Sequence, residues 1–200
     1  MARFLAIFAL LGASISLFAA SASASAETPL LVTPITEKKV ATLPAGDLFW
    51  CIETFPSIAQ AQAAAGTWGL VAQSAGKIWL FSLGSSGRSS AGGTKVADVG
   101  PIARVRAPEY LLRINDATGP PGSKTPVHSH PGSEAFFVLA GEQSIRMPDG
   151  VMRVKAGQPE AGHGAEMAMQ VSSSGTTDLH ALVMFAVDAT KPFSTPATFP

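Results

Sequence analysis

The sequence HSHPGSE, residues 128–134, places two histidines one residue apart and a glutamate four residues after the second. In an extended strand, residues two apart point to the same face, so His128 and His130 would direct their imidazoles at one spot. Pro131-Gly132 then turns or bulges the chain, and Glu134 can rejoin that spot from the start of the next strand. Two imidazoles and a carboxylate on one concave face can hold a divalent metal and leave positions open for water or a substrate.

A pair of surface histidines in a turn would explain the same short stretch equally well, so the wider context decides. The segment GSKTPVHSHPGSEAFFVLAG, residues 122–141, fits the pattern G-x5-H-x-H-x3-E-x6-G without a gap. It resembles the first signature motif of the cupin superfamily, and the resemblance is strongest over residues 110–187. Cupins are jelly-roll β-barrels. The resemblance therefore implies an all-β, cupin-type jelly-roll barrel in which His128, His130 and Glu134 are metal ligands.

The second cupin motif, P-x-G-x2-H-x3-N, would supply a fourth ligand, and here the chain departs from the pattern. In KAGQPEAGHGAEM, residues 155–167, Gly157 is the motif glycine, but Glu160 stands where the histidine is expected. Either a three-residue insertion carries His163 into the site, or Glu160 replaces the lost ligand. In the strand that follows, apolar residues occupy the odd-numbered positions, which are therefore expected to be buried. His163 is also odd-numbered and would point inward, which favours it as the ligand.

The rest of the chain also has the pattern of an all-β protein. From residue 96 onward, short apolar runs recur between turn signals, which is typical of a sandwich or barrel. We expect residues 96–190 to form the barrel core and residues 27–95 to be an N-terminal extension whose strands and one helix, near residues 56–65, pack on it. The proline-rich tail, residues 191–200, is expected to be an irregular segment on the surface.

The first 26 residues are predicted to be a secretory signal peptide. One arginine precedes a short apolar run, and Ala24 and Ala26 provide a small-residue cleavage site just before Glu27. The alternative is a permanent N-terminal membrane anchor. Cleavage would leave a secreted or periplasmic protein without a membrane segment.

Charge and cysteine content restrict the partners. Without Arg3 the mature chain has 13 basic and 14 acidic residues and no basic run, so we do not expect it to bind nucleic acid. The single cysteine, Cys51, has apolar neighbours and is expected to be buried. A homodimer is among the assemblies we consider.

Other residue types have more ordinary explanations. His180, in an apolar late strand, is expected to be a hydrogen-bonded core or edge histidine. Phe136 and Val138 share the parity of Glu134 and would form an apolar wall beside the metal. Three scattered cations could bind an anionic substrate but are expected to be solvated: Arg113, Lys124 and Arg146.

The resemblance leaves the function open, because fold does not settle function. One hypothesis is an exported metalloenzyme that uses Fe, Mn, Ni, Cu or Zn to act on a small organic molecule, with Glu134 as a catalytic base; a quercetinase-like dioxygenation is its most concrete form. The alternative is a non-catalytic module that binds a small molecule or metal in a degenerate cupin site. A third is a cupin whose metal is only structural.

Overall fold

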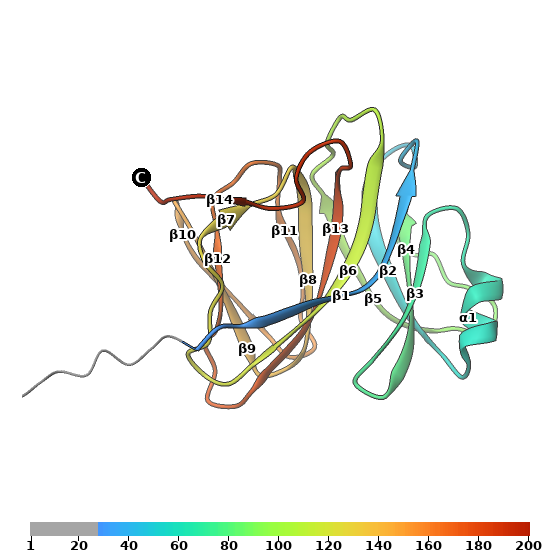
Figure 1. Cartoon of the computed structure of the whole chain (residues 1–200). Helices are drawn as coiled ribbons and strands as arrows, with labels where there is room; N and C mark the ends of the chain where they lie inside the picture. Colours follow the sequence, from blue (N-terminus) through green and yellow to red (C-terminus); the bar gives the residue numbers. More distant parts are fainter. Residues whose placement is uncertain (1–27) are drawn as a thin grey trace, which may run out of the picture.

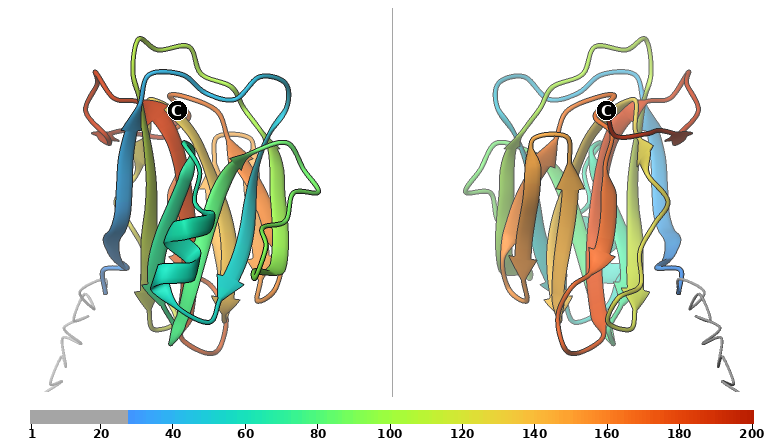
Figure 2. Two further views of the ribbon diagram at one scale, coloured as in Figure 1. Left: turned by 90° about the vertical axis from the view of Figure 1, so that its right-hand side faces the viewer. Right: turned by 90° about the vertical axis from the view of Figure 1, so that its left-hand side faces the viewer.

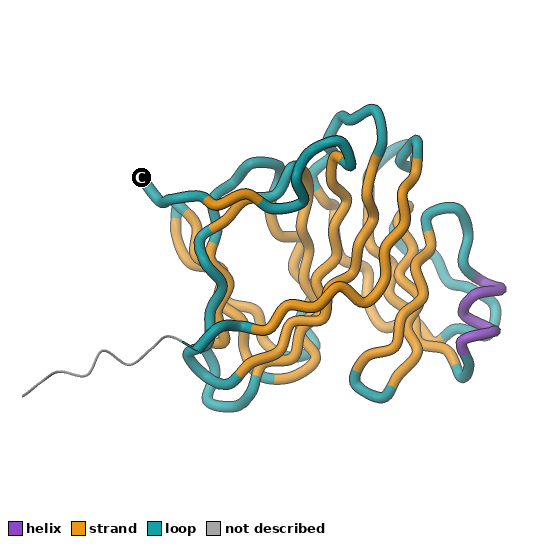
Figure 3. Tube along the Cα trace, viewed as in Figure 1, coloured by secondary structure: helices purple, strands orange, loops and turns teal. Residues whose placement is uncertain are grey.

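The computed structural model describes residues 28–200, which are built from strands and a single helix (Figures 1 and 3). The predicted signal peptide lies outside the described residues. The predicted all-β barrel with one short helix is confirmed. Within residues 28–200, no helix is long and apolar enough to cross a membrane.

A five-stranded antiparallel sheet forms the middle layer of the molecule. Its strands follow the order β1-β6-β13-β8-β11. Their bounds are β1 (Leu31–Val40), β6 (Tyr110–Gly119), β13 (Leu179–Asp188), β8 (Gly132–Ala140) and β11 (Pro159–His163). In Figure 1 this layer stands between the two outer layers.

The second wall of the barrel consists of short strands. The three-stranded sheet β10-β9-β12 and the two-stranded ladder β14-β7 contribute to it. Their bounds are β7 (His128–Ser129), β9 (Glu142–Met147), β10 (Gly150–Lys155), β12 (Gln170–Ser173) and β14 (Thr195–Pro196). Bridges from His128 to Met169 and from Lys124 to Ser172 join the segment around β7 to the segment around β12.

The third layer covers the outer side of the middle sheet. It is a four-stranded antiparallel sheet in the order β3-β4-β2-β5, with α1 at its far side (Figures 1 and 2). The bounds are β2 (Leu48–Phe55), α1 (Ile58–Ala64), β3 (Gly69–Ser74), β4 (Lys77–Gly84) and β5 (Thr94–Ile102).

Because side chains alternate along a strand, the middle sheet can bury both faces. Even-numbered residues of β13, including Leu182 and Met184, pack against the four-stranded sheet in a cluster with Trp50 and Phe81. Odd-numbered residues, including Val183, belong to a separate cluster inside the barrel. The nearly unbroken apolar run of β13, LHALVMFAVD, follows from this double burial.

The one helix agrees with its prediction and is shorter at both ends. Ser57 is the N-cap, and its hydroxyl accepts a hydrogen bond from the Gln60 amide, so Pro56 precedes the helix instead of occupying its first turn. The backbone leaves the helical conformation at Ala65.

His180 joins two layers through hydrogen bonds, as predicted for a core or edge histidine. Its Nε2 lies 2.9 Å from an Asp116 carboxylate oxygen and 3.1 Å from the Ser74 hydroxyl. Both contacts use the same ring nitrogen, so the group forms a branched polar cluster and lacks the relay geometry of a catalytic triad. Cys51 is fully buried, also as predicted.

Candidate metal and ligand site

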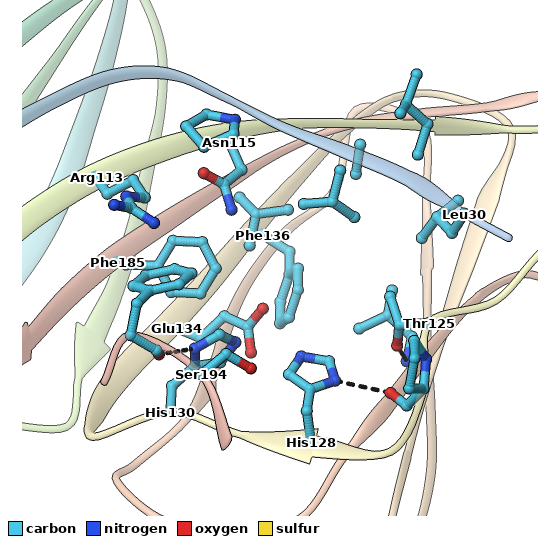
Figure 4. Close-up of a pocket in the computed structure, with 18 of the residues that line it drawn as sticks. Leu30, Arg113, Asn115, Thr125, His128, His130, Glu134, Phe136, Phe185 and Ser194 are labelled. Atoms are coloured by element: carbon cyan, nitrogen blue, oxygen red, sulfur yellow. Dashed lines mark hydrogen bonds between the residues drawn. The ribbon is translucent and has the colours of Figure 1, made fainter. Parts of the chain in front are cut away.

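A cavity of about 720 Å³ lies within the barrel (Figure 4). Its wall is mostly apolar and comes from the inner face of the middle sheet, from the segment around β7 and from residues 193–196. The polar side chains in the wall are Arg113, Asn115, Thr125, His128, His130, Glu134 and Ser194. The volume suits a small organic molecule.

The two motif histidines line this cavity side by side. Their ring centroids are 4.9 Å apart, with the planes nearly perpendicular. The Nδ1 atom of His128 lies 2.8 Å from the Pro126 carbonyl, and that of His130 lies 2.7 Å from the Phe193 carbonyl. A histidine that donates Nδ1–H to a carbonyl presents Nε2 as its lone-pair atom, which is the usual orientation of a metal ligand. Burial lowers the pKa of His130 to about 4, so its ring is neutral at pH 7.

The tail takes part in the site, whereas the sequence predicted only an irregular surface segment. Its β14 pairs with β7, the strand that begins at His128. The Phe193 ring packs 4.7 Å from the His130 ring and 4.9 Å from the Phe185 ring. The tail therefore holds His130 both by its backbone and by a side chain.

Glu134 lies on β8, inside the cavity wall and 3% exposed. Its Oε2 atom is buried and has no hydrogen-bond partner. Burial raises the pKa of this carboxyl to about 8. A carboxylate at this position needs either a proton or a cation, because an unpaired buried charge is costly.

A bulge on β11 determines where the two candidates for a fourth ligand lie. Glu160 pairs with Phe136 of β8, and His163 pairs with Glu134 after one extra residue at the bulge. Gly162 has φ of +63°, and a Cβ added there would lie 2.0 Å from the Glu134 carbonyl oxygen. Glycine is therefore required where the two strands approach. The bulge places His163 in register with Glu134.

The cavity wall, however, does not include His163. Its Nε2 is buried without a hydrogen-bond partner, and burial lowers its pKa. Whether His163 or Glu160 is a ligand stays a prediction.

The donor chemistry of the cavity fits a divalent metal, but the spacing is not that of a metal site. Two oriented imidazoles and an unpartnered carboxyl line the same space, and nitrogen and oxygen donors suit the middle and later first-row metals. Among residues 28–200, no three His, Cys, Asp or Glu side chains are gathered closely enough to hold an ion. The histidine and glutamate side chains would have to move together to coordinate one.

A second polar pair lies on β6, across the cavity from the histidines (Figure 4). Asn115 is 3% exposed, and its Oδ1 atom is buried without a hydrogen-bond partner. The Arg113 guanidinium stacks on the Phe193 ring, 4.0 Å from its centroid, and pairs with Glu37. Asn115 was not predicted from the sequence, and Arg113 was predicted to be solvated. Their spacing could have indicated this, because residues two apart on a strand lie on the same face, and one face of this strand lines the barrel.

The predicted apolar wall is present in part. Phe136 is fully buried and lines the cavity, whereas Val138 is buried in the same core cluster beyond it. The cations Lys124 and Arg146 do not line the cavity.

Comparison with known proteins gives similarities of fold only. No model of a protein family matches the chain, and no curated protein matches it. Three solved structures illustrate the similarities that were found. A cupin-like protein from Thermotoga maritima is 16% identical over 44% of this chain and 65% of its own, with a TM-score of 0.39. A Klebsiella pneumoniae protein with a double-stranded β-helix domain is 20% identical over 44% and 75%, with a TM-score of 0.38. A DMSP lyase from Ruegeria pomeroyi is 23% identical over 43% of each chain, with a TM-score of 0.37.

Each similarity spans less than half of this chain, and the chain spans about two thirds of the Thermotoga protein. These partial similarities are to proteins described as cupin-like or as having a double-stranded β-helix domain.

Proposed function

We propose that this chain binds a small organic molecule in the barrel cavity, beside a divalent metal ion held by His128, His130 and Glu134. One observation carries the proposal: two imidazoles oriented by backbone carbonyls and an unpartnered buried carboxyl line the same largely apolar cavity. His163 is the candidate fourth ligand, because it pairs with Glu134 across the bulge of β11.

The residues that line the cavity would have different roles. A bound divalent ion would polarise the oxygen atoms of the ligand. His130 would remain neutral, because burial lowers its pKa to about 4. Glu134 would hold the ion as a carboxylate or, when released from it, accept a proton, because burial raises its pKa to about 8 in the absence of an ion. The apolar wall, with Phe136 and Phe185, would exclude water and pack against the body of the ligand.

A quercetinase-like dioxygenation is the most concrete form of this proposal. The apolar wall suits an aromatic or otherwise weakly polar substrate, and the donor set suits Fe, Mn, Ni, Cu or Zn. Stoichiometric oxygen consumption with a phenolic or diketone substrate would support it.

The second candidate is a non-catalytic binding module. It is favoured by the spacing of the donors, since no three of them are gathered to hold an ion within residues 28–200. In that case Glu134 would stay protonated at neutral pH and donate a hydrogen bond to the ligand. Ligand binding by metal-free protein, with no turnover in air, would support this candidate over the first.

Elemental analysis of protein purified without a histidine tag tests the metal. We expect about one divalent ion per chain, lost in the His128→Ala, His130→Ala double variant. His180→Gln is the matched control, because His180 lies outside the cavity wall. Full occupancy in the double variant would refute the proposed metal site. The variants His163→Ala and Glu160→Ala then identify the fourth ligand, because only the loss of the true ligand should weaken metal binding.

We also propose that the protein is exported and cleaved after Ala26, to the periplasm or the outside of the cell. N-terminal sequencing of protein expressed with its leader should begin at Glu27. An intact Met1 on membrane-associated protein would favour the anchor instead.

A further inference from the structure

We infer that the ligand of this cavity is a small aromatic or apolar molecule with an anionic oxygen next to a hydroxyl or N–H group at one end, held by Arg113 and Asn115. The inference rests on the proposed function, because it names the class of ligand that the same cavity takes. It concerns the side of the cavity away from the cupin motif, where the structure places two polar groups that the proposed metal site does not use.

Arg113 is a positioned cation in the cavity wall. Its side chain is 18% exposed, and it is the only lysine or arginine among the wall residues in the described part of the chain. Nε and Nη2 contact one Glu37 oxygen at 2.7 and 2.5 Å, and the guanidinium lies over the Phe193 ring. These contacts hold the planar group in place and leave further N–H donors. A guanidinium in fixed orientation suits an anionic oxygen, above all a carboxylate.

The Glu37 carboxylate leaves Arg113 able to bind a second anion on its cavity side. Its side chain is 51% exposed and lies outside the cavity wall, so solvent screens its charge. The cavity side of Arg113 therefore keeps its attraction for an anion.

Asn115 supplies the complementary acceptor. It is one of the buried polar residues, and its Oδ1 has no partner. A buried polar atom left unpaired lowers the stability of the folded state, so such atoms are normally satisfied by protein, water or ligand. Since Asn115 also lines the cavity, a hydroxyl or N–H group of the ligand can satisfy it.

The strand register indicates an approximate length for the ligand. Arg113 pairs with Phe185, and Phe185 pairs with Glu134, so one row of side chains leads from the cation to the motif carboxyl. Neighbouring strands lie about 4.8 Å apart, which puts the two ends of this row about 10 Å apart. A ligand with its polar head at β6 would lay its body across Phe185 and reach Glu134 with its other end. One ring with a short side chain has this length.

Three probes of the same size and different head groups test the inference by isothermal titration calorimetry on the full chain. They are 3-phenyllactate, with a carboxylate beside a hydroxyl, 3-phenylpropionate, with the carboxylate alone, and 3-phenyl-1-propanol, with no charge. We expect phenyllactate to bind most tightly and the alcohol most weakly, with steps of about tenfold, as expected for one charge-assisted or one neutral hydrogen bond.

Two arginine variants separate the site from general electrostatics. Arg113→Met should weaken both acids about tenfold or more and leave the alcohol unchanged. Arg146→Met is the matched control, because Arg146 also stacks on a tail phenylalanine, Phe199, but lies outside the cavity wall. Asn115→Leu should remove only the advantage of phenyllactate over phenylpropionate. If Arg113→Met does not fold, Arg113→Lys should keep the preference for acids over the alcohol while binding them more weakly.

Equal binding of the alcohol and the acids to the unaltered protein would overturn the inference, as would equal effects of the two arginine variants or the failure of both acids to bind. The proposed function is judged separately, by the metal content of the histidine variants. Alcohol binding to metal-loaded protein, without a preference for acids, would refute the anionic ligand and leave the proposed function intact.

Discussion

The two faces of the middle sheet belong to the same strands, but only one of them carries buried polar atoms that lack hydrogen-bond partners. The outer face packs against the four-stranded sheet through residues such as Ile114 and Leu182, both fully buried among apolar neighbours. The inner face carries Asn115 and Glu134, each with a buried oxygen that lacks a partner. The outer face therefore stabilises the fold mainly by burying apolar side chains. The inner face stabilises it less, because it presents unpaired polar groups to a cavity.

The largest expected effect comes from the outer face. Leu182→Ala should lower the free energy of unfolding by about 2–5 kcal/mol, because it leaves a cavity between two packed sheets. On the inner face, Asn115→Leu should leave the stability unchanged or raise it, because it removes an unpaired buried amide oxygen. Urea denaturation of both variants measures the contrast. A comparable loss of stability in Asn115→Leu would show that the amide has a structural partner.

An effect of intermediate size is expected in the pH dependence of the free energy of unfolding, and it comes from the inner face. The pKa of Glu134 in the folded protein, about 8, lies above its ordinary value, so its protonated form favours folding and stability falls as the pH rises toward 8. The pKa of His130 is lowered to about 4, which has the opposite effect between pH 4 and 6.5. Between pH 6.5 and 8, Glu134 acts without that opposition. There, metal-free protein should lose about 2 kcal/mol of stability.

Urea denaturation of chelator-treated protein at pH 6.5 and pH 8 measures this loss. Glu134→Gln should abolish it, because the amide does not titrate. Metal binding needs the ionised carboxylate, so affinity should fall as the pH drops below about 8. Unchanged stability across this range in the unaltered protein would mean that Glu134 is already paired in solution.

The smallest expected effect concerns the tail. Phe193→Ala removes the ring that packs on His130 and Arg113 but keeps the backbone carbonyl. Metal affinity should fall about tenfold, the low end of what loss of a supporting contact costs. Phe199→Ala is the matched control, since Phe199 stacks on Arg146 outside the cavity wall. Competition with a chromogenic chelator gives both affinities, and equal affinities for the two variants would contradict the role of Phe193.

The sequence was informative where the signal is local. The spacing of His128, His130 and Glu134 predicted residues that line one cavity, and the alternating apolar runs predicted the barrel. The strand period also anticipated the apolar wall at Phe136. Each of these inferences depends on contacts between near neighbours in the chain or on the two-residue repeat of a strand.

The sequence was silent where the contacts are distant. Nothing near Arg113 in the chain indicates Glu37 on β1 or Phe193 in the tail as its partners. Likewise, a proline-rich tail gives no local sign that its carbonyl will accept a hydrogen bond from His130. The bulge at Gly162 could be suspected from glycine, but its register with Glu134 depends on pairing with β8.

The position of β13 also determines how the protein can fold. This strand is buried on both faces and lies between β6 and β8, both of which precede it in the chain by dozens of residues. The middle layer is therefore incomplete until β13 inserts between two strands that were synthesised much earlier. Topologies dominated by such distant pairings fold slowly, and their intermediates expose apolar strands with unpaired edges. During that interval the chain would depend on chaperones or rapid collapse to avoid aggregation.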